Sequence, residues 1–121
     1  MKKTENTPFP APQGGGLEAL IRAMEGVPVL VAGDVMLDRF VYGYVERVSP
    51  ESPVPVLSVS REEAMPGGAG NTLANLKGLG AKGMILSVAG DDEDGKTLRR
   101  MIREMGCDDS GLLSDGARPT I

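Results

Sequence analysis

Three segments of the chain carry apolar residues at helical spacing. The predicted helices cover 16–25, 69–79 and a third segment that stops before Gly106, and a glycine follows each of them. The apolar face of the third segment recurs at i, i+3, i+4 and i+7, through Leu98, Met101, Ile102 and Met105. Each helix is therefore expected to turn one apolar face toward a core.

Two further segments, 27–32 and 82–89, are almost continuously apolar and lack the alternation typical of half-exposed strands. Such runs predict strands buried on both faces of a parallel sheet. Shorter strands are expected at 111–113 and, in part, at 118–121. Strands that alternate with helices indicate an α/β fold, with a parallel sheet and flanking helices.

Residues 40–61 follow a different pattern, rich in β-branched and aromatic residues and interrupted by prolines. Proline within a strand pattern favours an edge strand or an irregular ribbon. We therefore predict a small antiparallel β flap over about 40–61, inserted after the first strand. Residues 1–15 are polar and rich in proline and glycine, which predicts a disordered lead-in before a domain over 16–121.

Composition narrows the classes of function. The chain has 13 basic and 17 acidic residues, a net charge of −4, which disfavours a broad nucleic-acid-binding surface. Histidine is absent, which excludes a histidine base or metal ligand. No apolar run reaches membrane-spanning length, and the N-terminus lacks the apolar segment of a secretion signal. Cys107, either structural or reactive, has no internal disulfide partner, which favours the cytoplasm.

The most distinctive motif is the stretch PGGAGNTLAN at 66–75, between a strand-like and a helix-like segment. Without Cβ atoms, Gly67 and Gly68 let a polar ligand approach the backbone, and the following helix points its first amides at that ligand. Asn71 can donate and accept hydrogen bonds, which suits a sugar hydroxyl. The same glycines also suit a tight strand-to-helix connection, so the motif alone leaves both interpretations open.

Carboxylates occur at two comparable places. Asp34 and Asp38 follow the first predicted strand, and ligands of open α/β sheets bind beyond the carboxyl ends of strands. Each of them could instead cap or turn the chain. The acidic run at 91–94 has the composition of a Ca²⁺ or Mg²⁺ loop, but it lacks EF-hand spacing. It also precedes a helix, where negative charge complements the dipole, so we interpret it as helix capping.

Together these motifs resemble the ribokinase-like carbohydrate kinases. The first signature of that family matches Gly67, Gly68, Asn71, Gly80 and Gly90. Leu73 replaces the usual small residue. The segments 33–39 (GDVMLDR) and 49–56 (SPESPVPV) are similar to the kinase part of bifunctional heptose kinase/adenylyltransferases of bacterial lipopolysaccharide synthesis. The resemblance covers about 27–121.

The resemblance implies the N-terminal portion of a ribokinase-like fold, in which the flap is a lid over the sugar. The substrate-binding residues that it implies are Asp34, Asp38, Gly67, Gly68 and Asn71. Arg39 either binds a phosphate already on the sugar or extends along the lid. The family's catalytic base and anion hole belong to a later Gly-Ala-Gly-Asp motif that is absent here. We therefore expect the base beyond Ile121, and we assign no catalytic residue and no metal ligand.

The predicted function is that of a sugar kinase fragment. The parent enzyme would phosphorylate the anomeric hydroxyl of D-glycero-D-manno-heptose 7-phosphate, for ADP-heptose and lipopolysaccharide core synthesis. It would use ATP and Mg²⁺, whereas this chain alone is expected to bind neither and to be inactive. We expect a cytoplasmic homodimer that forms through the flap. The alternatives are a related kinase for another sugar, or a non-catalytic dimerisation or binding module.

Overall fold

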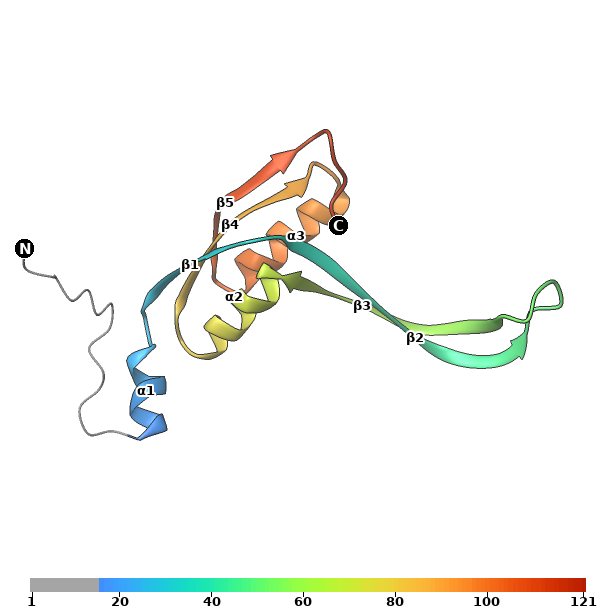
Figure 1. Ribbon diagram of the computed structural model, residues 1–121, viewed down its shortest axis with the longest axis horizontal. Coiled ribbons are helices and arrows are strands. Elements are labelled where there is room, and N and C mark those ends of the chain that lie inside the picture. Colours follow the sequence, from blue (N-terminus) through green and yellow to red (C-terminus); the bar gives the residue numbers. More distant parts are fainter. Residues whose placement is uncertain (1–15) are drawn as a thin grey trace, which may run out of the picture.

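The computed structural model describes residues 16–121, and the disordered lead-in predicted for 1–15 lies outside these residues. Figure 1 shows the order of the elements, which are α1 (Leu17–Ala23), β1 (Pro28–Ala32), β2 (Val35–Val48), β3 (Pro55–Gly68), α2 (Ala69–Gly78), β4 (Lys82–Gly90), α3 (Glu93–Glu104) and β5 (Asp108–Asp115). This order confirms the α/β class predicted from the apolar pattern.

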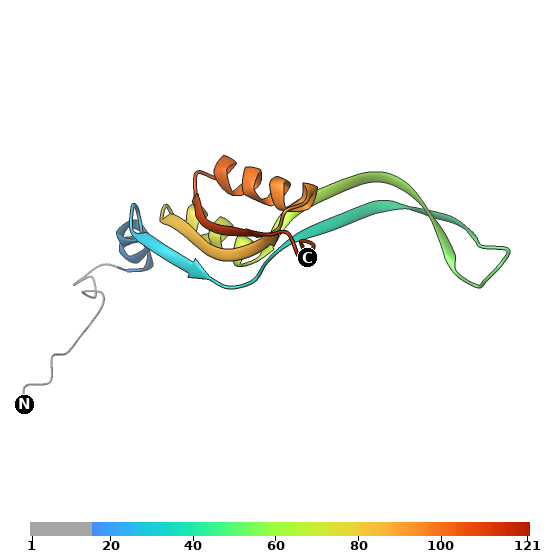
Figure 2. The same cartoon turned by 90° about the horizontal axis from the view of Figure 1, so that it is seen from above.

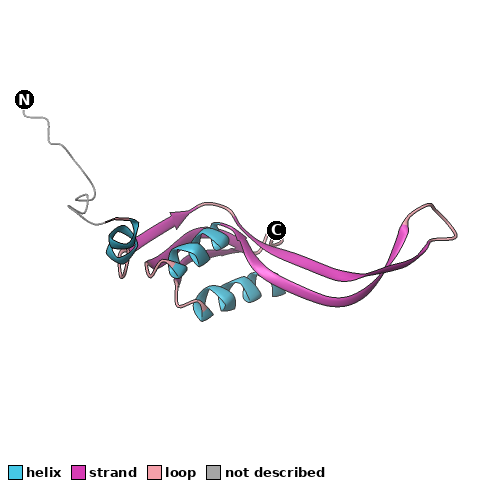
Figure 3. Cartoon of the chain, turned by 90° about the horizontal axis from the view of Figure 1, so that it is seen from below, coloured by secondary structure: helices cyan, strands magenta, loops and turns pink. Residues whose placement is uncertain are grey.

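β1, β4 and β5 form a parallel sheet with β4 in the centre. Figure 3 shows α2 and α3 on the same side of this sheet. The core lies between them, where four side chains retain no exposed surface: Leu73 of α2, Ile85 of β4, and Leu98 and Ile102 of α3. The inward faces predicted for the second and third helices therefore build this core, although Leu79 at the end of α2 remains exposed.

The prediction that the sheet is buried on both faces is wrong for the part of the chain that the structure describes. Along β4, Ile85 points toward the helices, whereas Met84, Leu86 and Val88 point away and are 40–46% exposed. Leu30 of β1 is exposed in the same way. The reason is that both packed helices lie on one face, and no element within 16–121 covers the other.

The ribbon, which we define as β2 and β3 with their connecting loop, confirms the predicted flap but is longer. Its antiparallel strands cover 35–48 and 55–68, and Figure 2 shows them projecting away from the rest of the molecule, the body. The added length places Asp38 and Gly67 in paired strands rather than in loops. Gly68, with a φ of +55°, ends the ribbon and turns the chain into α2.

α1 forms where the helical spacing predicts it, but none of its residues is buried. Its apolar side chains, from Leu17, Leu20 and Ile21, face solvent within the described structure. Gly26, which follows the helix, donates a backbone hydrogen bond to Gly80 at 2.8 Å. None of the helices in 16–121 is long and apolar enough to cross a lipid bilayer.

The strand expected at 118–121 does not form in the described structure. Side-chain hydrogen bonds hold this segment instead. Asp92 accepts from both the backbone N–H and the hydroxyl of Thr120, each at 2.7 Å. One backbone bond, from the N–H of Leu37 to the carbonyl of Ile121 at 2.7 Å, joins the segment to β2. The segment therefore spans from the start of α3 to the base of the ribbon.

Candidate functional site

Two of the turns singled out in the sequence lie against each other. The N–H of Ala69 donates to the carbonyl of Asp34 at 2.8 Å, and Val35 pairs with Gly68 across the ribbon. A Cβ atom at Gly68 would overlap the Asp34 carbonyl oxygen. The close approach, together with the positive φ, explains why glycine occupies this position. The end of β1 and the start of α2 thus form one continuous surface.

The Asp38 carboxylate lies directly over Gly67. A Cβ atom at Gly67 would overlap one carboxylate oxygen and would stand 2.8 Å from Cγ of Met36. Asp38 is half-buried, and it takes part in none of the ion pairs within residues 16–121. Its acceptor oxygens therefore remain available to a ligand that carries hydroxyl groups. Met36, which sequence reasoning missed, supplies an apolar neighbour on the same face of β2.

Asn71 lies in the first turn of α2 and is exposed. Its carbonyl accepts a hydrogen bond from the side chain of Asn75 at 3.0 Å, which leaves its own side-chain amide on the surface. The structure therefore places the backbone of Asp34 against Gly68 and the carboxylate of Asp38 against Gly67, with Asn71 three residues after that turn.

Arg39 does not join this group in the structure. Because side chains alternate along a strand, it points to the opposite face of β2 from Asp38. There its guanidinium forms an ion pair with the carboxylate of Asp94, in the first turn of α3. This contact links the base of the ribbon to the body.

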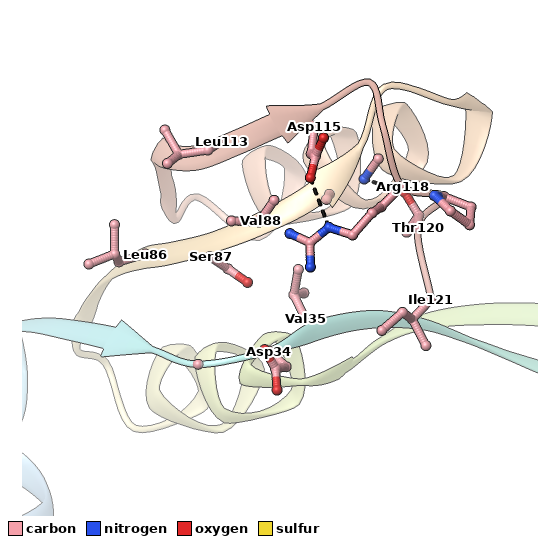
Figure 4. A pocket seen from close by; sticks show the side chains of 14 residues that line it. Asp34, Val35, Leu86, Ser87, Val88, Leu113, Asp115, Arg118, Thr120 and Ile121 are labelled. Carbon is pink, nitrogen blue, oxygen red and sulfur yellow. Dashed lines mark hydrogen bonds and ion pairs between the residues drawn. The ribbon is translucent and has the colours of Figure 1, made fainter.

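A pocket of about 560 Å³ opens at the carboxyl ends of the three parallel strands. Asp34 is the only residue of the predicted site that lines it. The polar residues that sequence reasoning missed here are Ser87, Asp115, Arg118 and Thr120, which Figure 4 shows around the cavity. The rule that ligands bind beyond the carboxyl ends of strands could have indicated Asp115, because it ends β5. Arg118 lies in a connecting segment, so the rule about strand ends could not have indicated it.

The acidic run before α3 caps that helix, as predicted. Asp92 is the N-cap residue, and its carboxylate accepts from the Gly95 N–H at 2.8 Å as well as from Thr120. The hydrogen bond from the Thr120 hydroxyl, followed by those from the backbone N–H groups of Thr120 and Gly95, lowers the pKa of Asp92 to about 2. The charged form therefore stabilises both the helix and the segment at 118–121.

Two backbone donors of the loop before α3 are already paired within the protein. The Gly90 N–H donates to the Thr120 hydroxyl at 2.9 Å and the Gly95 N–H to Asp92, so these donors are already used. Within 16–121, no group of three or more His, Cys, Asp or Glu side chains is placed to hold a metal ion. Two backbone donors of the loop are therefore unavailable to a phosphate, and no carboxylate cluster for Mg²⁺ is formed among the described residues.

Residues 28–121 match the model of the pfkB family of carbohydrate kinases. A bifunctional protein HldE from a Caulobacter species is 52% identical over 104 residues, which cover 86% of this chain and 21% of that protein. The chain thus spans about a fifth of the length of the curated relatives it matches.

Solved structures show the same arrangement of elements. A carbohydrate kinase from Agrobacterium tumefaciens superposes with a TM-score of 0.60 and 27% identity, over 78% of this chain and 29% of that one. A fructokinase from Xylella fastidiosa, solved with bound ATP, gives a TM-score of 0.58 at 19% identity, over 78% of this chain and 28% of that one. At 19% identity, the similarity to the fructokinase shows a shared fold.

Proposed function

Because this chain belongs to the pfkB family of carbohydrate kinases, we propose that it forms the sugar-binding part of a heptose kinase. The reaction is transfer of a phosphoryl group from ATP to the anomeric hydroxyl of D-glycero-D-manno-heptose 7-phosphate. The observation that carries the proposal is the free Asp38 carboxylate over Gly67, beside the joined turns of Asp34 and Gly68. The choice of a heptose rests on segments 33–39 and 49–56 and on the 52% identity to a bifunctional protein HldE.

In this proposal each residue of the site makes a different contact with the sugar. The Asp38 carboxylate accepts hydrogen bonds from two sugar hydroxyls, and each charge-assisted bond contributes about 1.5–3 kcal/mol. Gly67 and Gly68 leave room for the sugar beside the backbone. Asp34 and Asn71 add an acceptor and an amide at the two ends of this surface, and Met36 faces the apolar C–H groups of the ring.

Among residues 16–121 we assign no group to the transfer of the phosphoryl group. Phosphoryl transfer requires a base for the attacking hydroxyl, donors for the developing negative charge, and Mg²⁺ on the nucleotide. The described residues hold no cluster of three or more metal-binding side chains, and the N–H groups of Gly90 and Gly95 are already paired. We therefore assign the binding of ATP and Mg²⁺, and the base, to other residues of the complete enzyme.

The ribbon is proposed as a lid over the sugar and as the contact of a homodimer. Its side chains include Tyr44 and Val45, which are 71% and 58% exposed, and a two-stranded ribbon cannot bury such groups alone. The exposure of these side chains also favours the second candidate function, a dimerisation module without catalysis. Arg39 would reach a sugar phosphate only by leaving Asp94. The buried, lone Cys107 is compatible with the reducing cytoplasm, where we place the enzyme.

A fusion protein tests the proposal. This chain would replace the matching N-terminal fifth of the Caulobacter relative, and ATP-dependent phosphorylation would be assayed with heptose 7-phosphate, ribose and fructose. We expect turnover of heptose 7-phosphate in the fusion and none above background in the 121-residue chain. Preference for ribose or fructose would assign a different sugar. A folded fusion that is inactive on all three, while the unaltered relative is active, would support the dimerisation module instead.

A further inference from the structure

We propose that Arg39 is a positioning residue for the Asp38 carboxylate. Its ion pair with Asp94 holds the base of the ribbon against the body and thereby keeps that carboxylate over Gly67. The inference rests on the proposed function, because it explains how the proposed sugar acceptor is held in place. This role involves no contact with the sugar, and it differs from the contact with a sugar phosphate that the sequence left open for Arg39.

Asp38 lies between two residues of β2 that contact the body. Leu37 belongs to the core cluster with 8% of its surface exposed, and its N–H donates to the carbonyl of Ile121 at 2.7 Å. Arg39 pairs with Asp94 at the start of α3. Because side chains alternate along a strand, Leu37 and Arg39 share the face of β2 that is turned to the body, and Asp38 points to the other face. The backbone is therefore attached to the body on both sides of Asp38.

The ion pair of Arg39 marks the point at which the ribbon leaves the body. In the register of the ribbon Arg39 lies opposite Ala64, which packs partly buried against the core cluster. The next pair on the same face, Val41 and Glu62, is exposed. No ion pair within 16–121 joins the ribbon to the body beyond this point, and Figure 2 shows the ribbon projecting past the start of α3. Among the described residues, this pair is thus the outermost ionic attachment of the ribbon.

Asp94 can serve as an anchor because the start of α3 is itself held in place. It lies two residues after the N-cap residue Asp92, whose carboxylate accepts hydrogen bonds from Gly95 and Thr120. Leu98, one turn farther along α3, has no exposed surface and fixes the helix in the core. A carboxylate in the first turn also complements the helix dipole. The ion pair therefore restrains the ribbon rather than the helix.

The expected effect on binding is modest, because both partners are partly exposed. The side chain of Arg39 is 56% exposed and that of Asp94 is 39% exposed, and ion pairs in such places contribute little to stability. Loss of the pair should therefore leave the chain folded and change how often the base of the ribbon is correctly placed. We expect a change of about two- to fivefold in sugar affinity, which is the limit for one exposed ion pair.

Sugar binding by the fusion protein tests the inference, with heptose 7-phosphate and free heptose as separate probes in calorimetry. Arg39→Gln and Asp94→Asn should each raise the dissociation constants of both sugars by that factor. Arg39→Lys keeps a charge that can pair with Asp94, so it should lose less affinity than Arg39→Gln. Lys96→Gln is the matched control, because Lys96 pairs with Glu93 in the same turn of α3. It should bind both sugars as the parent does.

A double-mutant cycle separates positioning from direct contact. In the Asp38→Asn background, Arg39→Gln should cause no further loss, because the charged acceptor that it positions is already gone. If Arg39 instead binds the sugar phosphate, its loss would add to that of Asp38→Asn and would spare free heptose. Asp94→Asn would then leave binding unchanged or make it tighter, because it releases Arg39. Any of these three results would overturn the inference.

A measurement without sugar separates this inference from the proposed function. In nuclear magnetic resonance spectra of the 121-residue chain, Asp94→Asn should shift the amide signals of Asp38 and Gly67, whereas Lys96→Gln should leave them in place. Unchanged signals in Asp94→Asn would show that the ion pair does not position the carboxylate. If the signals shift but the fusion protein binds neither sugar, the proposed function fails, while the attachment that fixes Asp38 is supported.

Discussion

In the body, Leu73, Ile85 and Leu98 lose all of their exposed surface, whereas Tyr44 and Val45 on the ribbon keep 71% and 58% of theirs. The body is stabilised by packing of the helices on one face of the sheet. The ribbon is stabilised by its backbone ladder and by the junction at its base. Side chains in the body are therefore committed to folding, while those on the ribbon are available to a ligand or a partner.

The largest difference should appear when one leucine is truncated in each region. Leu98→Ala in the body should lower the free energy of unfolding by about 2–5 kcal/mol, because it removes fully buried methyl groups and leaves a cavity. Leu57→Ala on the ribbon should cost less than about 1 kcal/mol, because that side chain is already 42% exposed. Urea unfolding monitored by circular dichroism measures both. Equal losses would contradict the division between body and ribbon.

The junction between the two regions can be tested with two glycines of positive φ. Gly68→Ala would place a Cβ against the Asp34 carbonyl, whereas the same change at Gly26 meets nothing within 4 Å. Both variants place a Cβ at a positive φ, which costs roughly 1–2 kcal/mol at left-handed helical angles, and Gly68 also has a ψ of −122°, outside that region. We expect Gly68→Ala to lower stability further and to displace the end of the ribbon. Equal stability of the two variants in chemical denaturation would show that the junction is not tightly packed.

A smaller effect is the loss of stability of the body at acidic pH. The pKa of Asp92 is about 2 in the folded chain, below the ordinary value of 3.8, so its charged form is favoured by folding. The stability that it contributes is present above about pH 4 and is lost as the pH falls toward 2. Asp92→Asn should lower the melting temperature at pH 7 and flatten its dependence on pH between 4 and 2. An unchanged pH profile in calorimetry would contradict the role of the Thr120 and Gly95 hydrogen bonds.

The sequence predicts the helices and turns of the body better than it predicts which surfaces stay exposed. Helical spacing placed Leu98 and Ile102 in the core, and glycine spacing indicated the turn at Gly68. The continuous apolar runs wrongly predicted a sheet buried on both faces. An apolar run shows which side chains could be buried, but it does not show whether a helix covers them, and Leu86 on the uncovered face remains exposed. Ser87 and Arg118 were missed, because only folding brings β4 and the last segment to one pocket.

The smallest expected change in the free energy of unfolding comes from a substitution on the ribbon that should affect assembly. Val45→Lys should leave the free energy of unfolding within about 0.5 kcal/mol of the parent value, because the side chain is exposed. It should nevertheless shift the chain toward monomer, because a charge disfavours burial in a dimer contact. Sedimentation at tens of micromolar measures this, with Arg22→Lys on α1 as a charge-neutral control. A monomeric parent chain would remove the dimer and leave the ribbon as a lid.

The most direct test of the central claim is the affinity of the fusion protein for heptose 7-phosphate before and after Asp38→Asn. The substitution keeps the shape over Gly67 and removes the charged acceptor. Calorimetry should show the sugar dissociation constant rising about 10- to 150-fold, as loss of a charge-assisted hydrogen bond implies, with the affinity for ATP unchanged. Unchanged sugar affinity would contradict the claim that this carboxylate over the glycine turn holds the substrate.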